Sequence, residues 1–456
     1  MLIEEINDIL PFAAYQALRP LGRPFISSGS IECQKRYSYV GASPSVTITT
    51  QDKRTVVTGA QIGCKDPFEA ASRIIPESAS PSPDAPFPFC GGIAGYFGYD
   101  LNELLEPSLF KDNAAQKKAQ GAVPDCCLGL YDTVFVFDHA EAKGYIVSPH
   151  ENAGKVKLFK ELLTARSGVF DRFPALYSPL RGASFTSNFT KEAYLEAIQK
   201  AHAYIAAGDI YQINLSQRLT MEITGDPFHL YATLLKSHPA PFSAFMDFGG
   251  FQVISNSPER MLMKNGRVIE TSPIKGTRRR GNTVDEDNAL IEELRLSDKE
   301  RAEHVMIVDL ERSDLGQVSA PGSVKVLEFG RIATYPHLHH MVSTIRGTLR
   351  PEVDAPEALK RVFPGGSITG APKIRAMQII AELEPCRRGL YTGAMGWIGF
   401  NGDMDMAMAI RTAVVKDGLL HLGVGGGIVA DSKAEDEYEE TLLKATDFLG
   451  ALGVKR

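Results

Sequence analysis

The sequence predicts an α+β fold. Patterns typical of strands and of helices mix along the chain without the regular strand–helix alternation that builds a parallel sheet. Residues 190–208 predict a helix, because Thr190 can cap it, apolar residues recur on one face, and Gly208 can end it. Residues 210–218 predict a strand, because apolar and polar side chains alternate there. The polar face of this strand meets either water or a cavity, and the motifs described below favour a cavity.

The N-terminal half predicts two more strands and two loops. Residues 91–100 are rich in glycine and predict a strand that other backbone approaches closely. Residues 130–138 predict one buried strand. The proline-rich residues 78–89 and the polar residues 111–121 predict loops. The chain is irregular from residue 165 to 187, and we place the main boundary there, between domains 1–165 and 185–456.

Composition excludes several classes of protein. The 456 residues are 44% hydrophobic and 23% charged, with a net charge of -6, so there is no electrostatic case for nucleic-acid binding. No apolar run reaches the roughly 18 residues that a membrane helix needs. The first residues are acidic where a signal peptide is basic, which favours a cytoplasmic location. The cysteines lack zinc-ligand spacing and predict reduced thiols.

A lysine at the end of a predicted strand is the strongest candidate for covalent chemistry. Residues 272–281 read Ser-Pro-Ile-Lys-Gly-Thr-Arg-Arg-Arg-Gly, so Lys275 lies between a proline and a glycine that restrict the backbone. A lysine held on a stiff scaffold near other positive charges can be uncharged enough to act as a nucleophile. The alternative is a surface turn with a solvated basic run.

Two predicted helices carry glutamates on one face. Glu300 and Glu303 lie three residues apart, as do Glu437 and Glu440, and such pairs share a helix face. Their oxygens suit Mg²⁺, which keeps waters and takes further oxygens from its substrate. The alternative needs no metal, because acidic residues in a first turn favour the helix dipole. The pairs Ser297/Glu300 and Ser432/Glu435 also predict capping boxes.

Two glycine-rich segments and one arginine predict an anion site. Residues 364–373 run into a helix, and such a loop points backbone N–H groups at an anion. Residues 423–429 allow close backbone approach to a ligand. Arg411 is a charge on an otherwise apolar strand and predicts a carboxylate partner, while Tyr391 fits either the core or the pocket.

Together these segments resemble the family of chorismate-utilising enzymes, over roughly residues 185–450. The resemblance rests on residues 208–218, 257–260, 272–281, 301–304, 339–343, 364–373 and 423–444. It implies a large antiparallel β-sandwich with helices packed on the outside. One position departs from the family pattern: Ser313 stands where the family usually has asparagine, at a position that looks structural.

The resemblance implies the substrate, the metal and their ligands. Glu259 would be the general acid that protonates the departing C4 hydroxyl of chorismate. Mg²⁺ would be held by Glu303 and Glu440, with help from Glu300 and Glu437, and would grip the ring carboxylate. The residues that the resemblance assigns to the substrate are Gln212, Thr277, His340, Thr369, Tyr391, Arg411, Gly425, Gly426, Gly427 and Lys444.

The N-terminal part resembles the domain that holds a tryptophan site in relatives. The match is loose and concerns Ser28, Tyr37, Ser38, Pro241, Phe242 and Ser243. The resemblance therefore implies a tryptophan site at these residues, and the sequence alone does not decide whether tryptophan binds there.

Two positions select the branch of the family. Relatives that add water carry a lysine base where this chain has Gln212, and an amide cannot take a proton from water. Anthranilate synthases commonly have alanine where this chain has Lys275. In the branch that aminates chorismate at C4, that lysine attacks C2, and ammonia then displaces it by adding at C4. The alternatives are an anthranilate synthase large subunit and a non-catalytic subunit that binds a glutaminase or tryptophan.

The resemblance also implies two partner proteins. No glutaminase signature occurs in the sequence, so ammonia would come from a separate glutaminase subunit. No lyase domain follows the predicted chorismate-binding domain, so a downstream aminodeoxychorismate lyase would release p-aminobenzoate for folate synthesis.

Overall fold

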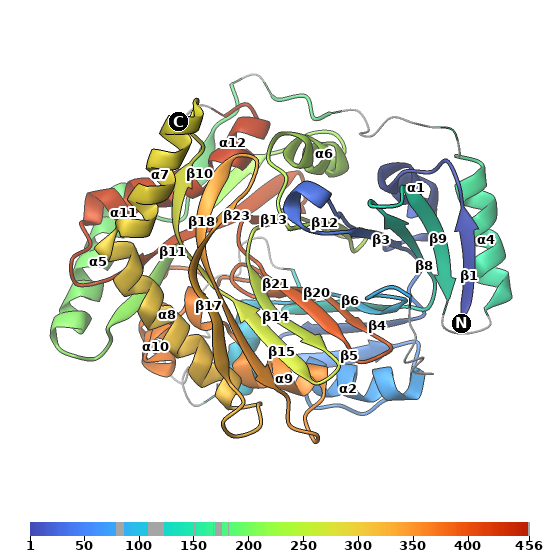
Figure 1. Cartoon of the computed structure of the whole chain (residues 1–456), viewed down its shortest axis with the longest axis horizontal. Helices are drawn as coiled ribbons and strands as arrows, with labels where there is room; N and C mark the ends of the chain where they lie inside the picture. The colour runs from blue at the N-terminus through green and yellow to red at the C-terminus, as the bar shows by residue number, and fades with distance from the viewer. Residues whose placement is uncertain are drawn as a thin grey trace.

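The computed structural model describes residues 1–78, 86–107, 123–148, 152–166, 168, 176–180 and 182–454. Two large antiparallel sheets lie face to face, with helices on their outer sides (Figure 1). The predicted α+β sandwich is therefore confirmed. The predicted loop at 111–121 and part of the one at 78–89 lie outside the described residues.

The first sheet has twelve strands and joins both halves of the chain. Its path is β1 (Leu2–Ile6), β9 (Lys143–Ser148), β8 (Val134–Asp138), β3 (Tyr37–Gly41), β2 (Phe25–Ser27), β12 (Phe242–Asp247), β13 (Gln252–Ser257), β22 (Thr412–Lys416), β23 (Leu419–Ile428), β11 (Gln212–Glu222) and β10 (Phe185–Ser187), while β19 (Gly370–Ala371) pairs with β11. The two halves meet where β2 pairs with β12.

The second sheet has eleven strands and joins the halves again. Its path is β16 (Ile274–Arg279), β18 (Leu338–Thr348), β15 (Val268–Ser272), β14 (Arg260–Asn265), β21 (Met404–Met408), β20 (Ala394–Gly399), β6 (Gly92–Phe97), β7 (Cys126–Tyr131), β4 (Val46–Gln51) and β5 (Arg54–Thr58), while β17 (Lys325–Thr334) pairs with β18. Here β20 pairs with β6. The segments 1–165 and 185–456 thus share both sheets through continuous strand pairing, and their division into two domains stays a prediction.

Helices cover the outer faces and one end of the sandwich. They are α1 (Pro11–Leu18), α2 (Pro67–Ser78), α3 (Asn102–Leu105), α4 (Ala153–Thr164), α5 (Lys191–Ala206), α6 (Pro227–Ser237), α7 (Val284–Leu296), α8 (Asp298–Gly316), α9 (Ala355–Val362), α10 (Lys373–Leu383), α11 (Ala434–Lys444) and α12 (Thr446–Ala451). In Figure 1, α1, α6 and α12 lie above the first sheet, and α2 and α9 lie below the second.

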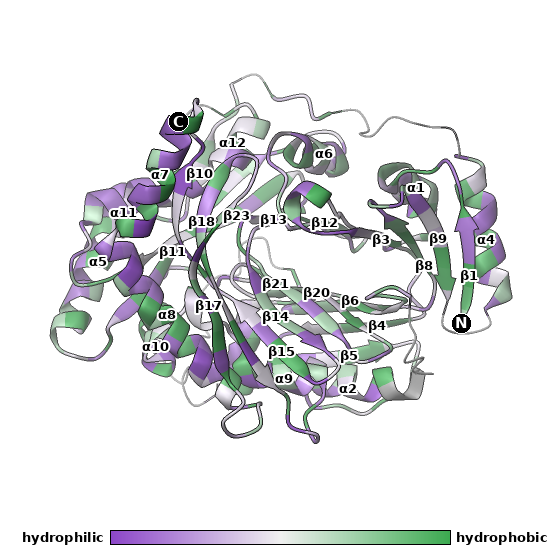
Figure 2. Cartoon of the chain, in the orientation of Figure 1, coloured by the Kyte–Doolittle hydropathy of each residue, from purple (hydrophilic) through white to green (hydrophobic). Residues whose placement is uncertain are grey.

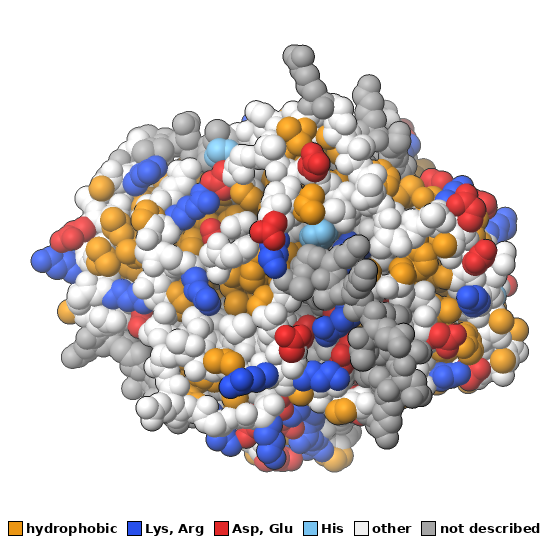
Figure 3. Space-filling model, turned by 180° about the vertical axis from the view of Figure 1, so that it is seen from behind, with side chains coloured by type: hydrophobic (Ala, Val, Ile, Leu, Met, Phe, Trp, Pro, Cys, Tyr) orange, Lys and Arg blue, Asp and Glu red, His pale blue; other side chains and the backbone are white. Residues whose placement is uncertain are grey.

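Separate apolar clusters fill the layers between these elements. Phe228 of α6 and Phe245 of β12 belong to the cluster between the first sheet and its helices, with ring centroids 5.3 Å apart. Tyr39 of the first sheet and Tyr96 of the second belong to the cluster between the sheets. The helices turn hydrophilic residues outward (Figure 2). On the reverse face, side chains of both charge signs are interspersed (Figure 3), so no single-sign field covers that face.

The expected helix and strand around residue 200 are present. Thr190 caps α5 by accepting a hydrogen bond from the Ala193 N–H, and Gly208 follows with φ +80°. The strand begins at Gln212 and continues to Glu222, four residues beyond the predicted end. Ile213 packs fully buried against α5 and α10, whereas Tyr211 precedes the strand and is 68% exposed.

Two local expectations are wrong. Residues 130–138 form no single strand, because the chain leaves the second sheet after Tyr131 and enters the first sheet at Val134. Apolar residues continue across this crossover because both strands are buried, so the pattern hides the turn. The Ser432/Glu435 capping box is also absent: α11 begins after Lys433, and Ser432 Oγ instead donates to Glu437 Oε1 at 2.7 Å.

No helix of the described residues is long and apolar enough to cross a membrane.

Candidate functional site

The expected site residues gather where the two sheets meet at one end of the sandwich. β11 and β23 come from the first sheet, and β16 and β18 come from the second. Helices α8 and α11 flank these strands on the left of Figure 1. β11 and β23 are paired directly, with Asn214 opposite Gly427.

Lys275 reaches from the second sheet to the first. A side-chain carbon placed on Gly427 would lie 3.3 Å from Lys275 Nζ and 2.4 Å from Gln212 Nε2. The three residues therefore converge on one point, and only glycine leaves room there. Gln212 is 1% exposed, and its Oε1 has no hydrogen-bond partner among the described residues. The polar face of β11 thus points into the interior, as the sequence predicts.

Glu259 is a buried carboxyl group next to this point. It lies between β13 and β14, where its backbone C=O accepts a hydrogen bond from the Met408 N–H at 3.0 Å. The hydroxyl of Ser367 donates to Glu259 Oε1 at 2.8 Å. Burial raises the pKa of Glu259 to about 7, although the Ser367 hydrogen bond and the Lys275 ammonium oppose the increase. A carboxyl group with such a pKa can serve as a general acid near neutral pH.

The two pairs of glutamates approach the site from α8 and α11. Glu300 pairs with Arg278 at 3.3 Å, and its N–H donates to Ser297 as the predicted cap requires. Burial raises the pKa of Glu303 and of Glu437. Glu440 behaves differently, because burial would raise its pKa but the Lys444 ammonium at 2.7 Å lowers it.

The donor set suits a hard cation. A side-chain carbon on Gly426 would lie 3.2 Å from Glu437 Oε2 and 3.9 Å from Glu440 Oε1, so both face the same strand. Within the described part of the chain, no three His, Cys, Asp or Glu side chains form a ready-made cage. Mg²⁺ needs no such cage, because one or two carboxylates, waters and substrate oxygens suffice. The residues therefore fit Mg²⁺ in donor type.

The expected anion-binding residues lie around the same strand of glycines. Lys444 Nζ donates to the Gly425 C=O at 2.9 Å. A side-chain carbon on Gly425 would lie 3.0 Å from the Tyr391 hydroxyl. Arg411 is paired with Asp447 at 2.7 Å, and its backbone adopts φ +46°. This partner is a carboxylate, as predicted, but it comes from α12 of the same chain. The predicted strand position is wrong, because Arg411 lies in the connection between β21 and β22.

The remaining expected residues are placed by hydrogen bonds. Thr277 Oγ1 lies 2.9 Å from His340 Nδ1. Burial lowers the pKa of His340 to about 3, so its ring is neutral. The Thr369 hydroxyl donates to the Gly365 C=O at 3.0 Å and so holds its own loop.

Three site-supporting residues were missed by the sequence reasoning. Ser367 lies within the glycine-rich segment 364–373, but the sequence analysis predicted no function for it. Arg388 and Glu384 form a buried ion pair at 2.7 Å, and Arg388 also donates to the Asn214 and Ile368 carbonyls. This pair ties β11 to the glycine-rich loop behind Tyr391. An arginine and a glutamate four residues apart are the only trace of it in the sequence, and they also fit an exposed helix pair.

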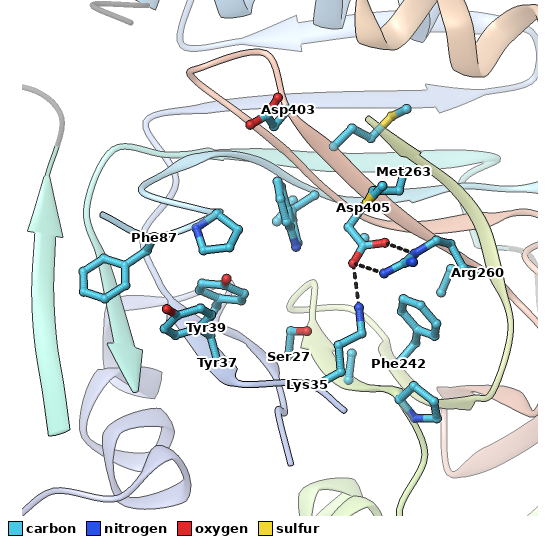
Figure 4. Close-up of a pocket in the computed structure, with 18 of the residues that line it drawn as sticks. Ser27, Lys35, Tyr37, Tyr39, Phe87, Phe242, Arg260, Met263, Asp403 and Asp405 are labelled. Atoms are coloured by element: carbon cyan, nitrogen blue, oxygen red, sulfur yellow. Dashed lines mark hydrogen bonds and ion pairs between the residues drawn. The ribbon is translucent and has the colours of Figure 1, made fainter. Parts of the chain in front are cut away.

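A separate cavity of about 700 Å³ lies where strands from the two halves of the chain meet (Figure 4). Of the residues expected at the tryptophan site, Ser28, Tyr37, Pro241 and Phe242 line it. Ser38 and Ser243 lie behind the wall, where Ser38 accepts from the Gly29 N–H and Ser243 donates to Asn256.

The wall of this cavity has a charged side and an aromatic side. Lys35 and Arg260 converge on Asp405, with Lys35 Nζ 2.6 Å and Arg260 Nε 2.9 Å from its oxygens. Tyr37 and Phe87 lie opposite, with ring centroids 5.6 Å apart. The cavity therefore suits a ligand with one charged end and one aromatic end.

Comparison with known proteins gives consistent matches over most of the chain. The family model described as chorismate binding enzyme matches residues 24–450. The chain is 41% identical to anthranilate synthase component 1 of Thermus thermophilus, over 92% of this chain and 89% of that protein. It is 39% identical to aminodeoxychorismate synthase component 1 of Bacillus subtilis, over 90% and 88%. The crystal structure of anthranilate synthase component I from Streptococcus pneumoniae superposes with a TM-score of 0.79 at 33% identity, covering 90% of this chain and 91% of that one.

We expect Glu384→Gln to destabilise the protein, because it leaves the buried Arg388 guanidinium without its counter-charge. Breaking a buried pair in this way costs about 3–5 kcal/mol of the free energy of unfolding. Chemical denaturation of both proteins measures the difference. Glu382→Gln is the matched control, because Glu382 lies in the last turn of α10, two residues before Glu384, is exposed and accepts a hydrogen bond from the Tyr204 hydroxyl. Equal stabilities for the two variants would contradict a structural role for the Glu384–Arg388 pair.

Proposed function

The chain belongs to the chorismate binding enzyme family, and on that premise we propose that it converts chorismate and ammonia to 4-amino-4-deoxychorismate. One observation carries the choice of product: Lys275 Nζ lies beside Gly427 and Gln212 inside the site. Anthranilate synthases commonly have alanine at the position of Lys275, and relatives that add water have lysine at the position of Gln212. This chain has an amine where only the C4-aminating branch needs one.

The proposed chemistry proceeds by two displacements. In its neutral form the Lys275 amine forms a bond to C2 of chorismate, the two conjugated ring double bonds each shift by one position, and the C4–O bond breaks. Glu259 gives its proton to the departing hydroxyl, which leaves as water. Ammonia then bonds to C4, both double bonds shift back, and the C2–N bond breaks so that Lys275 leaves as a neutral amine. The new ammonium group returns a proton to the Glu259 carboxylate, which restores the acid.

The remaining residues hold the substrate in this geometry. Arg411, Tyr391, Lys444 and the backbone of residues 425–427 would bind its carboxylates, with His340, Thr277 and Thr369 beside the ring. Bidentate contact between a guanidinium and a carboxylate fixes orientation as well as position. To bind substrate, Arg411 must share its guanidinium with Asp447 or exchange it.

Mg²⁺ is the cofactor that the glutamates would hold. Glu303 and Glu440 would supply its first ligands, and Glu300 and Glu437 would support them. When bound, the ion would neutralise the ring carboxylate of the substrate. The lysines near these glutamates balance part of the negative charge before an ion arrives.

Two partner proteins complete the proposal. A separate glutaminase subunit would supply ammonia, and an aminodeoxychorismate lyase would convert the product to p-aminobenzoate for folate synthesis. The relatives carry the words "component 1" in their names, which fits a chain that works with a second component.

The second cavity is proposed to bind tryptophan. Its aromatic wall of Tyr37 and Phe87 suits the indole ring, and the Phe242 ring lies beside the charged wall. Its charged wall of Lys35, Arg260 and Asp405 suits the ammonium and carboxylate groups.

Anthranilate synthase is the second candidate function, because relatives of that name are as similar to the chain as those of the first. An incubation of the protein with chorismate, Mg²⁺ and ammonium distinguishes the two functions when its products are separated by chromatography. We expect 4-amino-4-deoxychorismate, and p-aminobenzoate once a lyase is added. Fluorescent anthranilate formed without a lyase would reject the proposed branch, and no turnover at all would favour a non-catalytic subunit.

Replacing the nucleophile tests the covalent route. Lys275→Arg keeps the charge but removes the amine, so we expect C4 amination to fall by roughly 1000-fold or more. Intact mass spectrometry of wild-type protein quenched without ammonia should show an adduct on Lys275 that the variant lacks. Lys264→Arg is the matched control, because Lys264 lies on β14 and donates to the Gly402 C=O. An unchanged wild-type mass during turnover would count against covalent catalysis.

The pKa of Glu259 predicts how kcat/KM depends on pH. Its pKa is raised to about 7, so the acid form dominates below that pH and is lost above it. With free ammonia held constant, kcat/KM should therefore decline as pH rises through about 7. Glu259→Gln should lower kcat/KM by about 100- to 10,000-fold and remove this limb. A limb that survives in Glu259→Gln would assign the general acid to another group.

Calorimetry tests the second cavity. Tryptophan should bind the wild-type protein, and Phe242→Ala should weaken binding by about 3- to 10-fold, as expected for one aromatic contact. Leu158→Ala serves as control, because Leu158 is 40% exposed on α4, away from this cavity. Equal affinities of the Phe242 variant and the control would mean that tryptophan binds elsewhere.

A further inference from the structure

One carboxylate lies between the arginine proposed to bind substrate and a histidine. Asp447 is in the first turn of α12, and its Oδ2 accepts a hydrogen bond from Arg411 Nη1 at 2.7 Å. Its other oxygen, Oδ1, lies 3.7 Å from Nε2 of His238. The side chains of Arg411 and Asp447 are both half-buried, so solvent and salt screen their charges only in part.

A buried asparagine on β13 holds the backbone on both sides of this carboxylate. The N–H of Asn256 donates to the Arg411 C=O at 2.9 Å, and its side-chain amide donates to the His238 C=O at 2.8 Å. His238 directly follows α6, and α6 packs against α12, which carries Asp447. The three groups are therefore held near one another, and an exchange of partners needs only side-chain movement.

The hydrogen bonds of His238 decide what its Nε2 offers to Asp447. Ser237 Oγ donates its single proton to the Thr233 C=O at 2.8 Å, so it accepts from His238 Nδ1–H at 2.9 Å. In the neutral ring, Nε2 then carries a lone pair. A lone pair does not bind a carboxylate, and 3.7 Å is longer than a hydrogen bond. His238 can therefore bond to Asp447 only after Nε2 takes up a proton.

The charged and titratable groups around His238 come from several segments. Besides Asp447 and Arg411, the ring of His337, which lies between β17 and β18, has its centroid 5.2 Å from that of His238. Arg280 follows β16, and its N–H donates to the His337 C=O at 3.4 Å. Asp447 is thus the group that attracts a proton to His238, and Arg411 opposes this attraction while it is paired with Asp447.

We propose that Asp447 and His238 are positioning residues for Arg411. Asp447 holds the guanidinium while the site is empty, and His238 takes up a proton and binds the freed carboxylate when Arg411 turns to a carboxylate of the substrate. The proton comes from the solvent, and no covalent bond changes. The inference rests on the proposed role of Arg411 in binding chorismate. It supplies a new partner for Asp447, whose charge would otherwise be left half-buried and unpaired.

Calorimetric titration with chorismate, in the presence of Mg²⁺ and without ammonia, tests the exchange. Asp447→Asn removes the carboxylate that competes for Arg411, so it should tighten chorismate binding by about 3- to 10-fold. Asp417→Asn is the matched control, because it removes one charge from an exposed position at the other end of β22. Misfolding cannot produce tighter binding, so this result would not come from damage to the protein.

The histidine variant should have the opposite effect. His238→Phe keeps a ring but cannot take up a proton, so Asp447 stays unpaired when Arg411 leaves, and chorismate binding should weaken by about 3- to 10-fold. His229→Phe is the matched control at the first turn of the same helix. The double variant His238→Phe/Asp447→Asn should bind as tightly as Asp447→Asn, because no freed carboxylate remains for a histidine to neutralise.

Proton uptake is the second measurement. Titrations in two buffers with different enthalpies of ionisation give the number of protons taken up as chorismate binds. Wild-type protein should take up more protons than His238→Phe or Asp447→Asn, and those two should agree. A purely structural role for either residue predicts no change in proton uptake and no pair of opposite shifts in affinity.

The outcomes separate this inference from the proposed function. Chorismate binding in Asp447→Asn that is equal to or weaker than in wild type overturns the inference, and so does proton uptake that is unchanged in His238→Phe. The titration requires only binding, so a protein that binds chorismate but forms another product refutes the proposed function and leaves the inference intact. A protein that does not bind chorismate refutes both.

Discussion

The face-to-face packing of two antiparallel sheets is the constraint on which the site depends. Lys275 is on a strand of one sheet, whereas Gln212 and Gly427 are on paired strands of the other. No local segment can bring them together. Their approach is fixed because both sheets continue through strand pairing from the N-terminal part into the C-terminal part. The N-terminal strands therefore contribute to the site without supplying a residue to it.

The site also depends on buried charge that is only partly neutralised. Two acids near the expected substrate position have a partner that does not use all their hydrogen-bonding and charge interactions. Glu440 pairs with Lys444, and Glu259 accepts a hydrogen bond from the Ser367 hydroxyl. Burial raises the pKa of Glu259, and nearby ammonium groups oppose this. Such a balance suits a group that gives up a proton and regains it in one cycle. A fully paired carboxylate would be too stable as the anion to do so.

The sequence predicted the fold class and the set of segments that meet, but only part of their geometry. The α5 helix was predictable because cap, apolar stripe and terminal glycine agree. The turn between β7 and β8 was not, because strands buried on both faces lose the alternation that marks a turn. The Arg388–Glu384 pair was not predictable either. Residues four apart fit a solvated helix pair equally well, and only the tertiary structure shows that water is excluded.

A lysine alone does not select the amination branch; its surroundings must also keep competing reactions out. In the proposed function, Gln212 stands where relatives that add water carry a lysine base, and its amide cannot accept a proton from water. Gly427 leaves open the space that a side chain would fill between Gln212 and Lys275. The same opening that lets the amine reach the ring would admit water, so an inert residue at 212 matters as much as a reactive one at 275. Under the proposed function, specificity for amination therefore comes from a nucleophilic Lys275 combined with a Gln212 that cannot act as a base.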